Sequence, residues 1–387
     1  MSMRSVDVAV IGAGLAGASL ACALRASELS VALVEGREPE APPAQWDARV
    51  YAVSPGAAAF LDETGVWPRL DRARMTPVHR MEIFGDDGGH LEFSAYACGV
   101  CELAWIVESG LMHRELWESA KRQANLTLLC PAEPEQLVVD AQGVRLRLAG
   151  GQEVAARVAV GADGANSWVR RQAGIGARTF DYGEMGVVAN LACERAHGNT
   201  AFQWFRGDGV LAFLPLPGNR VSIVWSTLEA HAGELLALDP ALFCAAVREA
   251  SGARLGELEI VTAPQAFPLR LMRVEHPIAP RLALLGDAAH CIHPLSGHGI
   301  NLGFGDAASL AGVLAAAAPA DPGEAAVLRR YERARAEPVL AFQALTDALH
   351  RLFHARAAPL VLLRNLGLNL TGALPVVRNV LARQAMR

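Results

Sequence analysis

Residues 6–35 read VDVAVIGAGLAGASLACALRASELSVALVE, and this stretch decides the fold of the first part of the chain. Residues 6–11 form an apolar run that ends directly at glycines, which is typical of a buried parallel strand. Residues 15–26 are rich in alanine and leucine and predict a helix, and residues 31–34 predict a second buried strand. The segment therefore predicts a complete strand–helix–strand unit of the kind that binds nucleotides.

Three glycines in this unit stand at positions with separate physical tasks. Gly12 permits the tight turn after the strand, Gly14 lets the backbone approach a pyrophosphate, and Gly17 lets the helix pack closely. The free N–H groups at the helix N-terminus favour phosphate oxygens. Glu35 ends the second strand, where its carboxylate can bind ribose hydroxyls and would repel a 2′-phosphate. A bound dinucleotide other than NADP is predicted, and a glycine-rich turn used only for packing is the alternative.

Two later motifs distinguish FAD from NAD. One buried strand leads into GADGANS at 161–167, and another leads into GDAAH at 286–290, followed by HPLSGHGINLG at 293–303. Asp163 and Asp287 thus lie at strand ends, where a carboxylate can bind ribose or ribityl hydroxyls. The glycines of the last segment let a helix N-terminus approach a planar ring, and its dipole would stabilise the negative charge of a reduced flavin. FAD is therefore the predicted cofactor.

These three motifs resemble those of the class A flavoprotein monooxygenases, the family of para-hydroxybenzoate hydroxylase. Within that family the chain is most similar to the aromatic ring hydroxylases of ubiquinone biosynthesis. The likeness covers nearly the whole chain, in matching order and spacing. The segments that carry the closer likeness are DARVYAVS at 47–54, GVW at 65–67, LAFLPL at 211–216, VWS at 224–226, AFPL at 266–269 and residues 286–303.

The resemblance implies an enzyme with bound FAD, a transient NAD(P)H reductant and O₂ as co-substrate. It implies a flavin C4a-hydroperoxide that transfers oxygen to an electron-rich ring, so the cofactor carries the chemistry and no catalytic dyad or triad is expected. The favoured substrate is a small prenylated phenol, an intermediate of ubiquinone biosynthesis. Two alternatives stay open: a hydroxylase of a soluble aromatic metabolite, and a catalytically silent flavoprotein scaffold in a quinone-synthesis assembly.

The resemblance also assigns cofactor roles to individual residues. Arg49 matches a family arginine near the flavin, and a surface ion pair is its alternative role. Arg114 matches a recurrent FAD-contacting position, and a solvated helix residue is the alternative. Pro294 and His298 are expected at the flavin edge. The residues expected to bind the cofactor are Gly12, Gly14, Gly17, Glu35, Arg49, Arg114, Asp163, Gly164, Gly286, Asp287, Pro294, Gly297, Gly299, Ile300 and Asn301.

Three aromatic residues are candidates for the substrate pocket. Trp204, Phe213 and Trp225 lie on predicted strands, where ordinary sheet packing is the alternative role. His298 stands where the family commonly has glutamine, which affects the expected substrate and the tuning of the flavin. No metal is expected, because the histidines of residues 290–298 lie in a motif that the flavin explains and no carboxylate or cysteine set completes a ligand shell.

Composition limits the class of protein. Hydrophobic residues make up 52% of the chain, charged residues 19%, and the net charge is −5, so a nucleic-acid partner is not expected. The seven cysteines are scattered and odd in number, which indicates a reducing compartment. No run approaches the roughly 20 apolar residues of a membrane helix. We expect a cytoplasmic protein, with peripheral contact to the inner membrane left open.

The fold class expected is α/β, with a discontinuous Rossmann-like FAD-binding domain, a β-rich inserted substrate domain and a helical C-terminal segment. The last segment is apolar and basic, so it could bind an anionic membrane surface or a partner enzyme of quinone biosynthesis. Packing on the protein's own core is the alternative. The predicted parts are residues 1–75, 98–178 and 274–337 for FAD, 76–97 and 179–273 for substrate, and 338–387 for the C-terminal segment.

Overall fold

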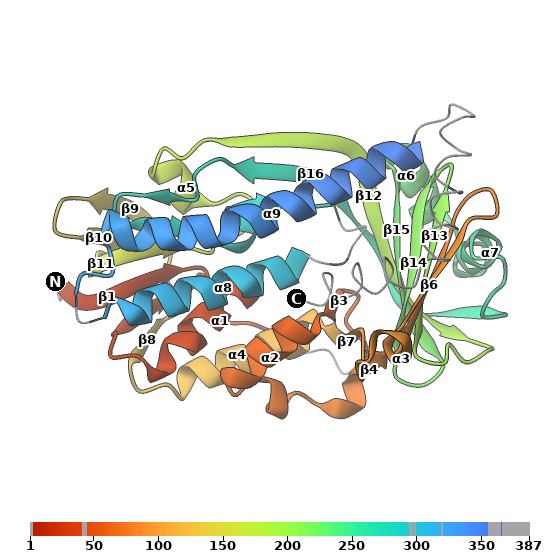
Figure 1. The fold of residues 1–387 in the computed structure, drawn as a ribbon, viewed down its shortest axis with the longest axis horizontal. Coiled ribbons are helices and arrows are strands. Elements are labelled where there is room, and N and C mark those ends of the chain that lie inside the picture. Colours follow the sequence, from red (N-terminus) through yellow and green to blue (C-terminus); the bar gives the residue numbers. More distant parts are fainter. Residues whose placement is uncertain are drawn as a thin grey trace.

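The computed structural model describes residues 3–40, 45–293, 297, 299–318, 320–354 and 365. Among these residues the chain forms two sheets of eight strands and one sheet of three strands. The two large sheets lie at opposite ends of the molecule (Figure 1). The long helix α9 (Ala325–His354) extends from the half that contains the first sheet to the half that contains the second.

The first large sheet is built around the N-terminal strand. Its strands are β1 (Met3–Ile11), β2 (Val31–Val34), β8 (Leu126–Leu129), β9 (Pro134–Val139), β10 (Val144–Leu148), β11 (Glu153–Gly161), β17 (Ile278–Ala279) and β18 (Leu282–Leu284). The order is β17-β18-β11-β1-β2-β8, and β10 and β9 extend the sheet from β11. The strands from β18 to β8 run parallel, and residues 8–11 of β1 together with β2 and β18 are apolar and buried on both faces.

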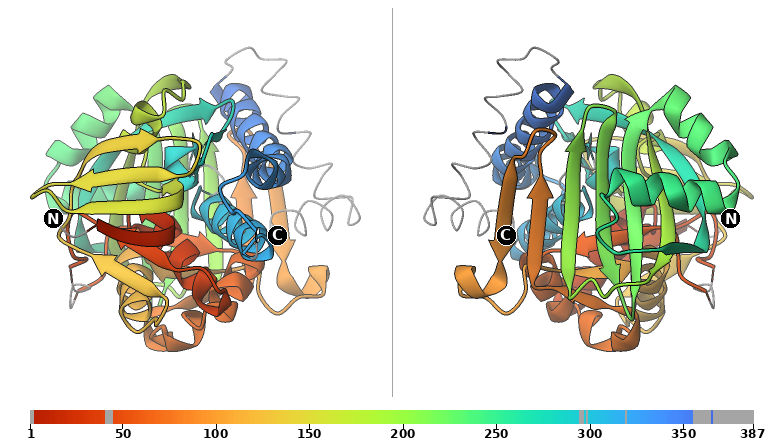
Figure 2. Two further views of the ribbon diagram at one scale, coloured as in Figure 1. Left: turned by 90° about the vertical axis from the view of Figure 1, so that its left-hand side faces the viewer. Right: turned by 90° about the vertical axis from the view of Figure 1, so that its right-hand side faces the viewer.

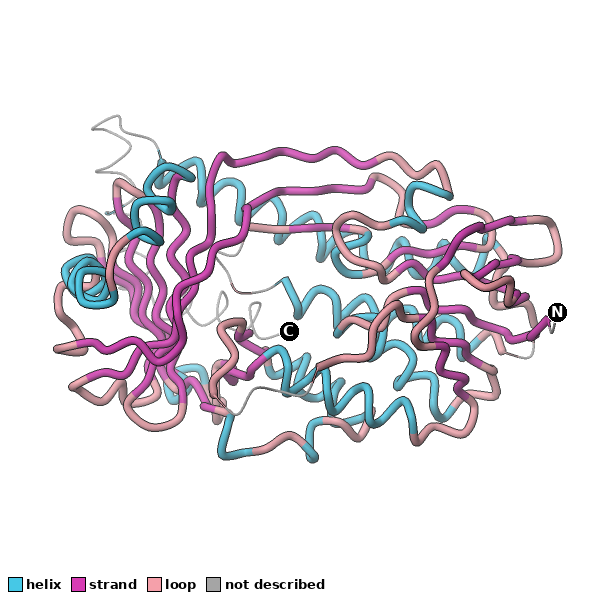
Figure 3. The backbone as a smooth tube through the Cα atoms, turned by 180° about the vertical axis from the view of Figure 1, so that it is seen from behind, coloured by secondary structure: helices cyan, strands magenta, loops and turns pink. Residues whose placement is uncertain are grey.

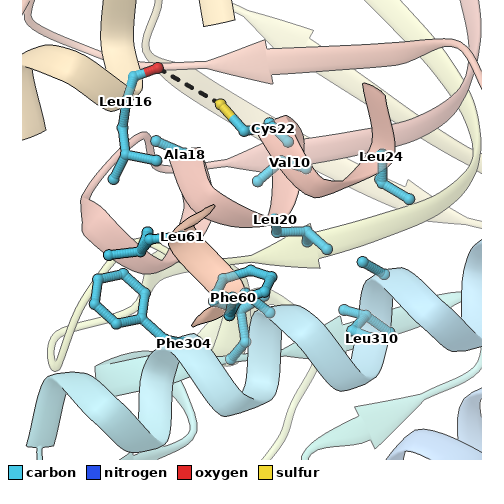
Figure 4. Packing of buried hydrophobic residues seen from close by; sticks show 14 of the residues in the cluster. Val10, Ala18, Leu20, Cys22, Leu24, Phe60, Leu61, Leu116, Phe304 and Leu310 are labelled. Atoms are coloured by element: carbon cyan, nitrogen blue, oxygen red, sulfur yellow. Dashed lines mark hydrogen bonds between the residues drawn. The ribbon is translucent and has the colours of Figure 1, made fainter. Parts of the chain in front are cut away.

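Helices pack on this sheet and bury its apolar side chains. They are α1 (Leu15–Ala23), α2 (Pro55–Glu63), α4 (Ser109–Lys121), α5 (Trp168–Gln172) and α8 (Gly299–Ala316), with short 3₁₀ turns η1 (Leu24–Ala26), η2 (Trp67–Arg69), η3 (Arg72–Arg74) and η4 (Gly286–Ala288). Figure 4 shows Leu20, Phe60, Phe304 and Leu310 filling the space between α1, α2 and α8. The core of the first half therefore lies between helices from the beginning and the end of the chain.

The second large sheet stands at the other end of the molecule. Its strands are β5 (Arg80–Phe84), β6 (His90–Ser94), β12 (Ala177–Cys193), β13 (Thr200–Arg206), β14 (Gly209–Leu216), β15 (Arg220–Leu228), β16 (Leu258–Val274) and β19 (His290–Cys291), in the order β19-β16-β12-β15-β14-β13-β5-β6. The long strands β12 and β16 pair antiparallel and reach back toward the first half (Figure 3). Helices α6 (Glu229–Ala237) and α7 (Pro240–Ala250) pack on this sheet, and α7 covers the side that faces away from the first half (Figure 2).

A small sheet lies beside the two halves. Its strands are β3 (Val50–Val53), β4 (Thr76–Val78) and β7 (Ala104–Glu108), in the antiparallel order β3-β7-β4, and the short helix α3 (Ala95–Cys98) precedes β7. Val78 of β4 and Ile106 of β7 form one apolar cluster with Ala201 and Leu216 of the second large sheet. The small sheet therefore packs against the inner side of the second half.

The predicted α/β fold class is confirmed, and so is the initial strand–helix–strand unit. The second strand has the predicted bounds, whereas the first begins earlier, at Met3, and the helix gives way to a 3₁₀ turn after Ala23. Helix α9 continues through Pro338, the residue at which the predicted C-terminal segment begins, so that segment starts inside a helix of the first half.

Most of the predicted C-terminal segment, residues 338–387, lies outside the described residues. Asn365 is described, and it is buried against the turn between β5 and β6. Its side-chain oxygen accepts a hydrogen bond from the Gly89 N–H at 3.1 Å, and its amide donates to Asp86 at 2.9 Å. Earlier in the same segment, Phe353 of α9 is buried with its ring centre 3.7 Å from that of Phe205, and Gln343 donates to the Met272 carbonyl at 3.0 Å. The described parts of the segment therefore pack on its own chain.

Helix α8 is long and apolar enough to cross a membrane by length and composition. In the structure, however, Phe304, Leu310 and Leu314 on this helix are fully buried in the core of the first half. Helices α1 and α9 lie against it (Figure 1). The apolar character of α8 is therefore accounted for by packing inside the protein.

The core around Phe304 provides a test of this packing. Phe304 is fully buried and its ring centre lies 6.3 Å from that of Phe60. We expect Phe304→Ala to lower the free energy of unfolding by about 3–5 kcal/mol, because it leaves a cavity between α2 and α8. Urea denaturation measures this change. Leu242→Ala, at a side chain that is 55% exposed, is the control and should change stability by less than about 0.5 kcal/mol.

Candidate cofactor site

The three glycine motifs meet around two alanines, Ala16 and Ala162. A Cβ at Gly12 would lie 2.5 Å from the Ala162 carbonyl oxygen, and a Cβ at Gly17 would lie 2.8 Å from the Ala162 Cβ. On the other side, a Cβ at Gly286 would lie 3.1 Å from the Ala16 Cβ. Glycine is required where two backbones approach so closely. Backbone packing therefore brings together three motifs that are far apart in the sequence.

Gly14 differs from these neighbours, because nothing lies within 4 Å of the position that its Cβ would occupy. It is the N-cap of α1, with a φ of −60° that any residue can adopt, and no side chain caps the helix. The first N–H groups of α1 therefore have no side-chain acceptor and lie beside open space. This arrangement fits the pyrophosphate of a dinucleotide.

Glu35 lies at the edge of the same turn. Its Oε2 accepts a hydrogen bond from the Ala13 N–H at 2.7 Å, and its Oε1 accepts one from the Arg37 N–H at 3.3 Å. On α4, His113 Nε2 lies 2.7 Å from the Ala13 carbonyl oxygen, so the turn is held from two sides. A hollow of about 340 Å³ opens beside this point, lined by Gly36, Arg37, Glu38, Trp117, Leu128 and Cys130. Its position fits the adenosine end of a dinucleotide.

Asp163 organises the second motif through its own main chain. Its carboxylate accepts hydrogen bonds from the Ser167 hydroxyl at 2.5 Å, the Trp168 N–H at 2.7 Å and the Val169 N–H at 3.0 Å. These bonds satisfy the start of helix α5. Gly164 has a φ of +80° and open space around it, so the backbone after Asp163 is accessible. The carboxylate therefore shapes the turn and leaves the main chain at Gly164 accessible.

The third motif is held by a buried network centred on Asp306 of α8. Asp306 Oδ2 accepts a hydrogen bond from the Gly286 N–H at 2.9 Å and lies 2.6 Å from His290 Nε2. Arg335 of α9 donates from Nε to Asp306 Oδ1 at 2.7 Å. Burial alone would raise the pKa of Asp306, but His290 and Arg335 hold it below its ordinary value of 3.8. The network fixes the turn that presents Asp287.

Asp287 and Arg49 lie close to one another. Surrounding protein raises the pKa of Asp287, while the charges of His290 and Arg49 oppose this rise. Burial likewise raises the pKa of Tyr51, and Arg49 opposes it. Arg49 is exposed and forms no salt bridge within the described part of the chain, and its guanidinium carbon lies 5.9 Å from the ring centre of Phe267. Its predicted contact with the cofactor stays a prediction.

The segment expected at the flavin edge is only partly described. Pro294 and His298 lie outside the described residues. Gly297 has a φ of +62°, and Gly299 begins α8. Asn301 donates from Nδ2 to the Ala52 carbonyl at 2.8 Å and accepts from the Ser54 N–H at 2.9 Å, which ties α8 to β3. Ile300 packs against the core of the first half.

Arg114 pairs with its own helix. Its Nη2 lies 2.9 Å from Glu118 Oε1, one helical turn away, and the side chain is 37% exposed. The neighbouring His113, which sequence reasoning missed, is the residue of α4 that contacts the dinucleotide turn at Ala13. The predicted contact of Arg114 with FAD stays a prediction.

The three candidate aromatic residues lie on one face of the second sheet. Phe213 and Trp225 are buried in the cluster that includes residues of α6 and α7, and Trp204 packs against it. The ring centre of Trp204 lies 4.9 Å from that of Phe213, in an edge-to-face arrangement. These side chains thus occupy the layer between the sheet and its covering helices. This layer lies on the side of the sheet turned away from the first half, so the three side chains are in ordinary sheet packing, and a pocket on the inner face of the sheet would not include them.

Two further residues could not be recognised from the motifs. Asp306 lies inside a helix and faces Arg335 and His290 only after the chain has folded. The one local signal is an acidic residue within an apolar helix, which indicates a buried partner. His113 gives no such signal, because an isolated histidine is common on a helix surface.

Comparison with known proteins agrees with this geometry. Residues 5–345 match the family model described as a FAD binding domain. The chain belongs to this family. It is 38% identical to ubiquinone hydroxylase UbiL of Rhodospirillum rubrum, over 99% of this chain and 90% of that protein. It is 33% identical to the 3-demethoxyubiquinol 3-hydroxylase of Escherichia coli, over 100% and 99%.

A relative in Homo sapiens, the mitochondrial ubiquinone biosynthesis monooxygenase COQ6, is 32% identical over 97% of this chain and 92% of that protein. These relatives confirm the resemblance to the hydroxylases of ubiquinone biosynthesis. The chain is therefore a FAD-dependent monooxygenase, and the prediction of FAD as its cofactor is confirmed.

Solved structures share the fold. The p-nitrophenol 4-monooxygenase PnpA of Pseudomonas putida has a TM-score of 0.83 at 18% identity, covering 100% of this chain and 99% of that one. PqsL of Pseudomonas aeruginosa, a probable FAD-dependent monooxygenase, has a TM-score of 0.80 at 23% identity, covering 94% and 99%. At this level of identity the likeness shows the fold alone.

A substitution at Gly14 tests cofactor binding without disturbing the packing of the protein. We expect Gly14→Ala to keep the fold, because the new methyl group meets no protein atom, and to weaken FAD binding at least about tenfold, because the methyl group occupies the space of the pyrophosphate. Titration of the apoprotein with FAD measures the affinity. Gly176→Ala, which also adds a methyl group in open space, is the control and should bind FAD normally. Equal affinity in both variants would contradict the assignment.

The Asp306 network predicts how stability depends on pH. The folded chain holds the pKa of Asp306 below 3.8, so its contribution is present above that value and is lost as the pH falls through the folded pKa. Burial alone would lower the pKa of His290, but Asp306 raises it above 6.5. The contribution of His290 is therefore complete below pH 6.5 and is lost as the pH rises through the raised pKa.

Between pH 3.8 and pH 6.5 we expect Asp306→Asn to lower the free energy of unfolding by about 3–5 kcal/mol. The substitution leaves His290 and Arg335, two buried cationic partners, without their carboxylate. Thermal melting of wild type and variant across the pH range measures the difference. The difference in stability between wild type and variant should become smaller at both acid and alkaline pH. A difference that is constant with pH would show that the carboxylate charge is not what stabilises this turn.

Proposed function

We propose that this enzyme hydroxylates the aromatic ring of a prenylated quinone precursor, using NAD(P)H and O₂. The observation that carries the proposal is similarity over the full length to proteins named ubiquinone hydroxylase, 3-demethoxyubiquinol 3-hydroxylase and ubiquinone biosynthesis monooxygenase. Bound FAD supplies the redox chemistry, in that it accepts a hydride from NAD(P)H and activates O₂. The protein binds and orients the cofactor and the substrate, and it excludes water from them.

The residues of the cofactor site divide these tasks. The N-terminus of α1 beside Gly14 would hold the pyrophosphate, and Glu35 would hold the ribose of the adenosine. The turn of Asp287, fixed by Asp306, would bind hydroxyl groups nearer the flavin. Arg49 would add positive charge at the same place. Together these groups would orient the cofactor between the two halves.

The substrate would lie on the inner face of the second sheet. Side chains alternate along a strand, so Ala212 and Leu214 lie on the face opposite to Phe213. Leu214 packs on the same apolar cluster as Ala52, and Asn301 at the start of α8 bonds the Ala52 carbonyl. This side of the sheet therefore adjoins the segment expected at the flavin edge, which supports an apolar pocket there.

Peripheral contact with the inner membrane is part of this proposal, with the enzyme on the cytoplasmic side. A prenylated substrate partitions into the bilayer, so access to it favours a membrane-facing surface. Exposed apolar side chains on α9 support it: Leu340 is 45% and Leu345 is 49% exposed. A partner enzyme of quinone biosynthesis could cover the same side chains.

The proposal is tested by turnover with a defined substrate. We expect NADH or NADPH oxidation to accelerate with a polyprenyl phenol in detergent, and one ¹⁸O atom from ¹⁸O₂ to enter the ring, measured by mass spectrometry. Ala212→Phe should raise KM at least about tenfold with FAD content unchanged, because its side chain narrows the inner face. Leu242→Ala, exposed and remote, is the control.

The other outcomes identify the alternatives. Oxygen incorporation only with soluble phenols would replace the proposal by a hydroxylase of soluble metabolites. Oxidation of NAD(P)H without a hydroxylated product for every phenol would favour a catalytically silent scaffold.

A further inference from the structure

A buried cluster of two histidines and a glutamate joins three parts of the chain. Glu184 belongs to β12, His293 follows β19, and His350 lies on α9. Glu184 Oε2 lies 3.2 Å from His293 Nε2, and Glu184 Oε1 lies 3.0 Å from His350 Nε2. The side chains of Glu184 and His293 are 2% and 1% exposed, and that of His350 is 12% exposed. The cluster is separate from the Asp306 network.

The local structure of β12 places the carboxylate in this position. The pairing of β12 with β16 shifts register between Asp181 and Glu184, and Gly183 has a φ of +67°. Such a bulge redirects the side chain that follows it. Glu184 is then in register with Leu228 and Leu269, so an ionisable residue stands between leucines of the two neighbouring strands.

Contrary to the expectation from sequence that no metal binds, we propose that Glu184, His293 and His350 bind a divalent transition-metal ion, with Zn²⁺ as the best fit. All three offer ligand atoms that lie within 4.8 Å of one another. Ligand atoms on a tetrahedral zinc ion, with bonds of about 2.0–2.2 Å, are about 3.3–3.6 Å apart. His350 Nε2 lies 3.0 Å from Oε1 of Glu184 and His293 Nε2 lies 3.2 Å from Oε2, so each imidazole approaches a different oxygen of the carboxylate at a separation slightly below that range.

The arrangement of the rings agrees with a shared ion. The ring centres of His293 and His350 lie 5.1 Å apart. Two imidazoles bound through nitrogen to one tetrahedral ion have ring centres about 5 Å apart, given a metal–nitrogen distance of about 2.0 Å. Tyr182 closes one side, with its ring centre 4.9 Å from that of His293 and 4.4 Å from that of His350.

The chemistry of the three side chains suits such an ion. A divalent cation neutralises Glu184 and binds both imidazoles in their neutral form, releasing protons as it enters. Two nitrogens and one carboxylate suit zinc, and they also accept cobalt as a spectroscopic substitute.

The ion would act as a structural cross-link. It would tie His293, just after β19, to β12 through Glu184 and to α9 through His350. This inference stands apart from the proposed hydroxylation, because it concerns metal content and not turnover.

The experiment uses the full-length, tag-free protein with FAD bound. We expect elemental mass spectrometry to find about one zinc ion per chain, and a chelator-treated sample to regain one equivalent of Zn²⁺. Cobalt added to the stripped protein should give absorption bands at longer wavelengths than oxidised flavin. Glu184→Gln keeps a hydrogen-bond acceptor of the same shape, so it should keep FAD and fold while its metal content falls at least about tenfold.

A second ligand variant and a matched control complete the test. His350→Asn should lower the metal content similarly. His276→Asn changes another histidine that pairs with a glutamate, at 2.9 Å from Glu332, on a 74% exposed side chain, and should leave the metal in place. FAD-loaded wild type that contains no metal and takes up neither Zn²⁺ nor Co²⁺ would overturn the proposal. A metal content equal in Glu184→Gln and wild type would also overturn it.

Discussion

The close approach of α1, β11 and α8 around Ala16 and Ala162 is the constraint on which the rest of the structure depends. At Gly12 and Gly17 a Cβ would collide with the backbone or Cβ atoms that surround it, and at Gly303 it would lie 3.4 Å from the Ala16 Cβ. These contacts bring the end of β1, the end of β11 and the start of α8 within one small region. A dinucleotide can span this region only because the backbones are so close.

Local sequence patterns predicted the elements that depend on local chemistry. The buried strand at residues 31–34 was recognisable because an apolar run covered on both faces has few alternatives. The roles of Gly12, Gly14 and Gly17 followed from the geometry of a strand–turn–helix unit, and the space around each differs as those roles require. Patterns of this kind act over a few residues, so they are visible in a single sequence.

Contacts between distant segments were not visible in this way. Asp306 meets Arg335 across two helices, and Glu184 meets His293 across more than a hundred residues of sequence. The periodicity of a strand or helix does not predict such partners, because each of these residue types also occurs in strands and helices without them. The aromatic residues show the same limit, because strand alternation places Phe213 and Trp225 on one face without telling which face the helices cover.

Three described residues near the end of β19 and the start of α8 are each held by a different part of the chain. His290 of β19 is fixed by Asp306, and Asn301 of α8 is tied to Ser54 of the loop before α2. His293, between them, meets Glu184, which also meets His350 on α9. A displacement of α9 would therefore act on His293 through His350 and Glu184, and on His290 through Arg335 and Asp306. Because α9 runs along both halves, its position and the positions of these two histidines are physically coupled.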